Sequence, residues 1–300
     1  MIARLLRWLL LVQLAAVALV AAGLVLSGVV ASVWLALLAA LAFALLVRLA
    51  ITTNNFVLSR WLGSPTPDSH RIGVWEAICM VAREFCATMF HSSWTMPQAR
   101  QRHRPHPGAH LPVLLVHGYA CNSGYWQALT RALDARAIAH ATIDLEPPGA
   151  SIDDYAPAIA AALAALGPGP AIVVAHSMGG LAMRAYLRRY GRARVARLIT
   201  LGTPHGGTAL ARFGIGINAR QMQVGSAWLR ELAASEDAAT RALILSMYSF
   251  HDNIIAPQTS SVLAGADHQA FAGIGHVALG SDPAVLAAVL AEINRVGKLV

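Results

Sequence analysis

Two long apolar segments at the start of the chain limit its possible folds more than any other feature. Trp8–Leu26 and Val29–Val47 each contain 19 residues, and the pair Ser27-Gly28 between them is typical of a turn. As a helix, each segment would be about 28 Å long, close to the ~30 Å hydrocarbon core of a membrane. Residues 1–51 contain no Asp or Glu and only three Arg. We therefore predict a transmembrane helical hairpin over residues 1–51, which excludes a wholly soluble chain.

Two other interpretations of this segment stay open. One is a single membrane anchor. The other is a cleaved signal peptide with Arg4 and Arg7 as its basic region and a cleavage site near Val20–Gly23. The second apolar segment, directly after the first, argues against cleavage alone. Arg48 and Arg60 follow the second segment, so the basic residues place both ends of a hairpin in the cytoplasm. With a single span, the rest of the chain would lie outside instead.

The positive charge of the chain is concentrated at this membrane end. The net charge is +8, of which residues 1–62 contribute +4, residues 63–110 contribute +2 and residues 111–300 contribute +2. Basic residues beside a membrane favour contact with anionic lipids. The C-terminal part is nearly neutral and has no nucleic-acid-binding motif, so we expect membrane lipids rather than nucleic acid as partners.

Residues 52–110 are predicted to link the membrane end to a separate domain. Apolar side chains recur at helical spacing over residues 74–90, which predicts an amphipathic helix. This helix either packs on the following domain or lies on the bilayer surface. Residues 100–110 contain three Arg, three His and two Pro without an acid, which indicates a solvated linker. Their histidines lack regular ligand spacing, so no metal site is expected.

The three cysteines are too few and too irregularly spaced for a disulfide framework. On a helix, Cys79 and Cys86 would lie about 10 Å apart along the axis, too far for a bridge. We expect both, and Cys121, to be buried or partly buried thiols.

Residues 111–300 alternate between short β-rich segments and helical segments. Strands are predicted over residues 111–119, 139–145, 171–176, 195–202, 242–250 and 267–273. Helices are predicted after residue 123, over 151–166 and 178–190, and from Ser281 onward. This alternation predicts an α/β domain with a mostly parallel sheet and helices on both faces.

Ser177 is the candidate nucleophile. It lies in the segment Ala175-His176-Ser177-Met178-Gly179, between a predicted strand and a predicted helix. A serine hydroxyl is a poor nucleophile unless it is held beside a base. A tight turn flanked by small residues presents the hydroxyl above the sheet, at a helix N-terminus. The bland alternative is that Ser177 only caps the helix.

A serine nucleophile on such a turn is followed along the chain by an acid and then a base. Asp252 comes just after one predicted strand, and His276 follows the last one in Gly-Ile-Gly-His. Both fall at the sheet edge where ligands bind in α/β proteins. His276 would take the proton from Ser177, and Asp252 would orient the imidazole. His251 is the rival base, and Asp144 is the rival acid.

The negative oxygen that forms during acyl transfer needs backbone N–H donors. Met178, directly after the nucleophile, supplies one candidate donor. Tyr119, in the loop after the first strand of the domain, supplies the other. His117 is expected to be structural. This chemistry requires no cofactor, and we expect none.

Five motifs over residues 111–300 resemble the α/β-hydrolase superfamily, and most of all its small bacterial lipases. They are VHGY (Val116–Tyr119), AHSMGG (Ala175–Gly180), LGTPHGGT (Leu201–Thr208), Asp252 in HDNIIAP, and His276 in GIGH. The resemblance implies the α/β-hydrolase fold, a triad of Ser177, Asp252 and His276, and an oxyanion hole at Tyr119 and Met178. Ala175 replaces the glycine of most members, as in a subset of small lipases. His205 is expected to be structural.

The sequence therefore predicts a membrane-anchored serine hydrolase that cleaves carboxylic, lipid-derived esters through an acyl-enzyme, in the inner membrane of a bacterium. A thioesterase or acyltransferase with the same triad and a catalytically silent membrane scaffold of the same fold are the alternatives. Residues 209–232 mix apolar side chains with Gly, and form either a cap over an acyl pocket or a core-packing helix with a loop. Nothing in residues 1–51 can act as base or nucleophile. A chain starting near Leu111, or near Trp61 if the linker helix packs on the domain, should thus hydrolyse short soluble esters.

Overall fold

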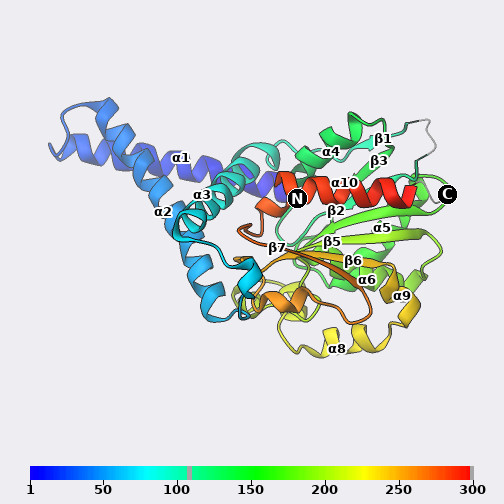
Figure 1. The fold of residues 1–300 in the computed structure, drawn as a ribbon. Coiled ribbons are helices and arrows are strands. Elements are labelled where there is room, and N and C mark those ends of the chain that lie inside the picture. The colour runs from blue at the N-terminus through cyan, green and yellow to red at the C-terminus, as the bar shows by residue number, and fades with distance from the viewer. Residues whose placement is uncertain (107–109, 298–300) are drawn as a thin grey trace.

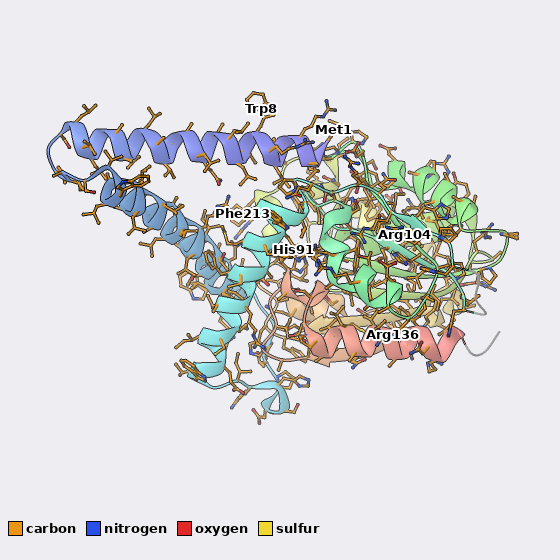
Figure 2. All side chains as sticks on the ribbon, turned by 90° about the horizontal axis from the view of Figure 1, so that it is seen from above. Met1, Trp8, His91, Arg104, Arg136 and Phe213 are labelled. Carbon is orange, nitrogen blue, oxygen red and sulfur yellow. The ribbon has the colours of Figure 1, made fainter. Side chains whose placement is uncertain are left out.

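The first two helices form a hairpin that projects away from the rest of the protein (Figure 1). The computed structural model describes residues 1–106 and 110–297. Residues 107–109 of the predicted linker and 298–300 of the predicted domain lie outside the described residues. Helices α1 (Ile2–Leu26) and α2 (Val33–Trp61) are both long and apolar enough to cross a membrane. Most of their side chains are exposed, including that of Trp8, which points away from the rest of the molecule (Figure 2).

Helix α2 is longer than the predicted second span. It begins at Val33, where Ser32 accepts a hydrogen bond from the N–H of Leu35, and it ends only at Trp61. Residues 52–61, which we assigned to the linker, are therefore its last three turns. No Gly or Pro interrupts α2, and Gly63 and Pro65 follow soon after its end.

Helix α3 (Val74–Phe90) lies where its apolar spacing predicts it, and a short π-helical turn (His91–Thr95) follows. Its inner face buries Met80 and Glu84, while Val74 and Trp75 on the opposite side are exposed. Glu84 accepts hydrogen bonds from the following domain, so α3 packs on that domain. The outer face of α3 remains apolar and exposed.

Seven strands form one sheet in the order β1-β3-β2-β4-β5-β6-β7. They are β1 (His103–Arg104), β2 (Val113–Val116), β3 (His140–Ile143), β4 (Ala171–His176), β5 (Val195–Leu201), β6 (Ile244–Ser249) and β7 (Asp267–Phe271). All neighbours are parallel except β1 and β3. Strand β1 corrects the sequence prediction, which placed these two residues in a solvated linker. Because its side chains are exposed, β1 carries no apolar pattern that would reveal it.

Helices cover both faces of this sheet, which confirms the predicted architecture. Helices α5 (Ala156–Ala165), α6 (Met178–Tyr190) and α8 (Ala227–Ala234) pack on one face, and α4 (Gln127–Asp134) and α10 (Pro283–Gly297) on the other. The short helices α7 (Ile217–Gln221) and α9 (Ala238–Ala242) lie between β5 and β6 in the chain. Alternate residues of β2 and β4 enter the two opposite cores.

The cysteines are all free, but their exposure differs from the expectation at one position. Cys79 and Cys121 are partly buried, whereas Cys86 is exposed. Burial raises the pKa of the Cys121 thiol to about 12, which makes it a weak nucleophile at neutral pH.

Candidate active site

Ser177 occupies a strained turn between β4 and α6. Its φ of 54° lies in the left-handed region, which costs free energy for a residue with a Cβ. The turn is held because the N–H of Ser177 donates to the Leu201 carbonyl (2.8 Å) and the Thr203 hydroxyl donates to the Ser177 carbonyl (2.9 Å). Gly179 is required next to it, because a Cβ there would lie 2.5 Å from the Val116 carbonyl oxygen. Strain maintained in this way is typical of functional sites.

Asp252 and His276 meet at the same sheet edge. Asp252 follows β6 and His276 follows β7, and His276 Nδ1 lies 2.7 Å from Asp252 Oδ2. The other carboxylate oxygen, Oδ1, accepts the N–H groups of Ile254 and Ile255, both at 2.8 Å. Both side chains are buried. Burial alone would lower the pKa of His276, but the charge and hydrogen bond of Asp252 outweigh it and raise that pKa above the ordinary value.

His176 connects this pair to the nucleophile turn. It precedes Ser177 in the chain, its ring centroid lies 4.5 Å from that of His276, and its Nε2 lies 3.1 Å from the His276 carbonyl oxygen. Within residues 1–106 and 110–297, Ser177 Oγ makes no hydrogen bond to the His276 ring. In enzymes without substrate such contacts are often long and shorten when the substrate binds.

The rival acid and base have other partners. Asp144 accepts the N–H of Ser123 at 2.7 Å, and His251 Nδ1 accepts the N–H of Gly273 at 3.1 Å. In the described part of the chain, neither side chain makes a hydrogen bond to the predicted triad. His251 instead supports the loop that carries His276.

The two candidate oxyanion donors come from the N-terminus of α6 and from the loop after β2. Met178 is the first residue of α6, where helix geometry leaves its N–H without an intrahelical acceptor. The loop after β2 approaches closely, since a Cβ on Gly118 would lie 2.7 Å from the Cβ of Ser177. The Tyr119 hydroxyl donates to the Ile215 carbonyl at 2.8 Å, which ties this loop to the segment after β5.

Two histidines that we expected to be structural are fully buried with backbone or side-chain partners. His117 Nε2 accepts the N–H of Leu145 at 2.9 Å, and His205 Nε2 lies 3.3 Å from the Thr200 hydroxyl. Burial lowers the pKa of both imidazoles, so they are neutral at physiological pH.

Ser177 opens into an apolar cavity of about 270 Å³. The segment 209–232 supplies much of its wall, including Leu210, Phe213 and Met222. Phe213 is mostly exposed while Met222 is buried, so this segment covers the cavity and also packs into the core. Helix α2 contributes Asn55 and Leu58, which were assigned to the linker.

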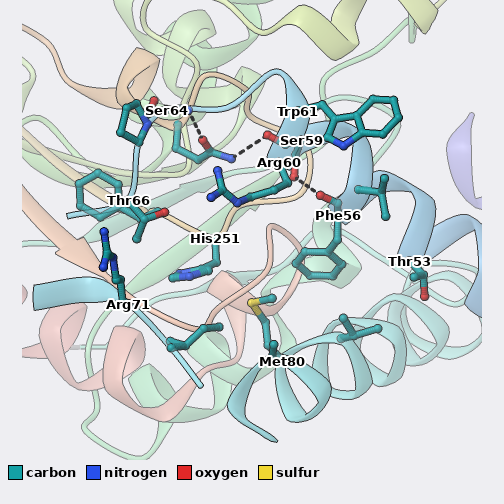
Figure 3. Close-up of a pocket in the computed structure, with 17 residues that line it drawn as sticks. Thr53, Phe56, Ser59, Arg60, Trp61, Ser64, Thr66, Arg71, Met80 and His251 are labelled. Atoms are coloured by element: carbon teal, nitrogen blue, oxygen red, sulfur yellow. Dashed lines mark hydrogen bonds between the residues drawn. The ribbon is translucent and has the colours of Figure 1, made fainter. Parts of the chain in front are cut away.

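A larger cavity, of about 690 Å³, is a different space between α2 and α3 (Figure 3). Ser177 is not among the residues that line it. Arg60, Arg71 and His251 face a wall formed by Phe56 and Met80, and none of the lining residues is acidic. The joint between the N-terminal hairpin and the domain therefore has a positively charged, partly apolar hollow.

Glu84 is a residue near the site that the sequence analysis missed. It comes from α3, and its carboxylate accepts the N–H groups of Val277 and Ala278, both at 2.9 Å, directly after His276. Its side chain is almost completely buried, and burial raises its pKa. No local signal singled it out, because α3 also carries the charged residues Glu76 and Arg83.

Among the residues that the structure describes, His106, Asp134 and His140 form a group that could hold a metal ion, with ligand atoms within 4.8 Å of one another. Both His Nε2 atoms lie 3.7–3.8 Å from Asp134 Oδ1. Arg102 also approaches this carboxylate, at 3.8 Å. The group lies at the start of β3, at the sheet edge opposite to the triad. It has no part in the chemistry at Ser177.

Comparison with known proteins supports the same fold. The sequence profile of a family described as alpha/beta hydrolase fold matches residues 112–224. No curated protein sequence shows significant similarity to the chain. The mature lipase BlEst2 of Bacillus licheniformis has a similar structure, with a TM-score of 0.57 at 18% identity over 65% of this chain and 98% of that one.

Two further solved structures show how far this similarity reaches. Lipase B of Aspergillus fumigatus gives a TM-score of 0.54 at 17% identity, over 66% of this chain and 56% of that one. A bromoperoxidase of Bacillus anthracis gives 0.51 at 13% identity, over 65% and 94%. At these identities the shared property is the fold, which hosts more than one chemistry. The profile match, the sheet order and these structures together show that the chain has the α/β-hydrolase fold, and that its fold is similar to that of a bacterial lipase.

Proposed function

We propose that this protein is a membrane-anchored serine hydrolase that cleaves carboxylic esters of lipid origin. The observation that carries the proposal is the buried Asp252–His276 hydrogen bond at the same sheet edge as the strained turn of Ser177. A serine, an imidazole and a carboxylate in this chain order form the catalytic unit of acyl-transfer enzymes. In this protein Ser177, Asp252 and His276 follow the parallel strands β4, β6 and β7.

The proposed reaction has two halves. His276 Nε2 takes the proton of Ser177 Oγ while the oxygen attacks the ester carbonyl carbon, and the N–H groups of Tyr119 and Met178 stabilise the resulting oxyanion. The imidazolium then protonates the departing alkoxide, which leaves an acyl group on Ser177. A water molecule, deprotonated by His276, releases the acid in the same way. Asp252 stays ionised and stabilises the imidazolium throughout.

The location of the cavity supports a lipid-derived substrate. Its walls are mostly apolar, and Asn55 and Leu58 come from the same helix that we propose to span the membrane. Phe213 and Ile215, at the edge of this region, expose large apolar side chains. An acyl chain that enters from the bilayer surface would therefore stay in apolar surroundings until its ester group reaches Ser177.

A serine-directed fluorophosphonate probe on native membranes tests the activity class. Labelling should disappear in Ser177→Ala and persist in the control Ser235→Ala, which changes an exposed serine on another element. If the wild-type protein is not labelled, a catalytically silent scaffold of the same fold becomes the better description. Matched esters and thioesters of equal acyl length, with and without an acceptor alcohol, separate a hydrolase from a thioesterase or acyltransferase.

A further inference from the structure

Helix α3 makes hydrogen bonds to both ends of the loop that carries His276. The guanidinium of Arg83 donates to the Gly273 carbonyl at 3.1 Å, three residues before His276. The next residue along the helix, Glu84, accepts the N–H groups of Val277 and Ala278, directly after it. The two adjacent side chains of α3 thus bind complementary backbone groups of one short loop.

The loop is shaped to receive the Glu84 carboxylate. Gly275 lies against it, and a Cβ at that position would lie 2.5 Å from Glu84 Oε2. Asn253 completes the arrangement, because its Oδ1 accepts the N–H of His276 at 2.9 Å. Three successive N–H groups, from His276 to Ala278, therefore donate to side chains outside the loop, and two of these donate to Glu84.

A buried carboxylate is costly unless its charge is compensated. Glu84 is 1% exposed, and no Lys, Arg or His in the described part of the chain forms an ion pair with it. Its compensation comes from the two N–H groups and from His276, whose imidazolium it would stabilise together with Asp252. When ionised, Glu84 would therefore favour the charged form of the same group that changes protonation during the proposed reaction.

We propose that Glu84 is a positioning residue for His276, so that a helix outside the five α/β-hydrolase motifs holds the base of the active site. The inference rests on the proposed function. It also joins the base to the membrane end, because Arg48 of α2 donates to Ser92 and Ser93 just after α3, both at 3.3 Å. Residues before Leu111 thus contribute to the active site and do more than anchor it.

Glu84→Gln in the full-length protein is the central test. Gln preserves the shape but removes the charge and replaces one acceptor by an NH₂ group that cannot accept a backbone N–H. We expect kcat on a short soluble ester to fall by about 10- to 100-fold, because small displacements of a catalytic group have effects of this order. KM should change little. Glu76→Gln is the matched control, since Glu76 lies on the same helix, is exposed and contacts only its N-terminus.

The pH profile separates positioning from general stability. Asp252, Glu84 and His176 are the titratable groups that face His276, and burial keeps His176 neutral. Removing the negative charge of Glu84 should lower the pKa of His276, so the acid limb of kcat/KM should move to lower pH. A merely structural role would leave this limb in place, and such a result would overturn the proposal.

Gly275→Ala tests the same contact from the loop side, where the new methyl group would displace the carboxylate. It should reproduce the loss, and the double variant with Glu84→Gln should lose little more, since both changes remove one interaction. Wild-type kcat in Glu84→Gln, or additive losses in the double variant, would overturn the proposal. An inactive wild-type protein would contradict the proposed function instead.

Discussion

At the scale of single residues, the two oxygens of Asp252 have separate partners. Oδ1 accepts two backbone N–H groups, which stabilise the ionised form, while Oδ2 faces His276. A carboxylate held in this way can orient the imidazole and compensate its positive charge without taking its proton. The role of each triad residue can therefore be tested separately.

Ser177→Ala and His276→Ala should each lower kcat by several orders of magnitude, and the double variant should lose little more. The reason is that neither group promotes attack without the other. The measurement is kcat on a soluble ester for both single variants and the double variant. Losses that simply multiply would show that the two residues do not act as one unit.

Asp252→Asn should fold normally and lower kcat by up to ~10⁴-fold, as in other triads. Asp252 raises the pKa of His276, so the acid limb of kcat/KM should also move to lower pH in this variant. Asp144→Asn is the control, because Asp144 binds the N–H of Ser123 instead. A severe effect of Asp144→Asn with a mild effect of Asp252→Asn would move the acid to β3.

At the scale of elements, α2 and α3 extend the hydrolase domain. Helix α2 is about 44 Å long, longer than a membrane core is thick, so its last turns reach the cavity beside Ser177. Helix α3 packs its inner face on the loop of His276. Elements that resemble a linker in sequence therefore form part of the walls and supports of the site.

Leu58→Trp should narrow the cavity from the α2 side. We expect kcat/KM for long-chain esters to fall at least about tenfold, because the loss of space for even one methylene group in an apolar pocket has an effect of this order. Acetate esters should be little affected. Val57→Trp is the matched control on the same helix, because Val57 lines the larger cavity instead. An equal loss on short and long esters would show that Leu58 does not limit acyl length.

Two shortened chains distinguish the contribution of α3 to activity from that of the hairpin. A chain that starts near Trp61 keeps α3 and should hydrolyse short soluble esters. A chain that starts near Leu111 lacks Glu84 and should lose this activity, contrary to what the sequence alone led us to expect. Circular dichroism and ester turnover are the measurements. Full activity of a folded chain from Leu111 would show that α3 is dispensable.

At the scale of the whole molecule, the exposed apolar hairpin leads to a prediction about the orientation of the protein in a membrane. Side chains along α1 and α2 are mostly exposed, which is unfavourable in water and suits a bilayer. With two spans, basic residues place the domain in the cytoplasm. Protease added outside intact cells should therefore leave the domain whole, and it should cut the domain after the membrane is permeabilised. Cleavage in intact cells would favour a single span.

The sequence by itself determined the alternation of strands and helices, the two membrane-length helices and the identity of the candidate triad. These features follow from local sequence patterns. The patterns are the apolar periodicity, the small residues around Ser177 and the order of Asp252 and His276 along the chain. Only the tertiary structure decided that Glu84 lies against the loop of His276 and that Leu58 lines the cavity of Ser177. Such contacts join residues that are distant in the chain, and no local pattern encodes them. Burial of one carboxylate among backbone N–H groups is favourable only once the helix has docked.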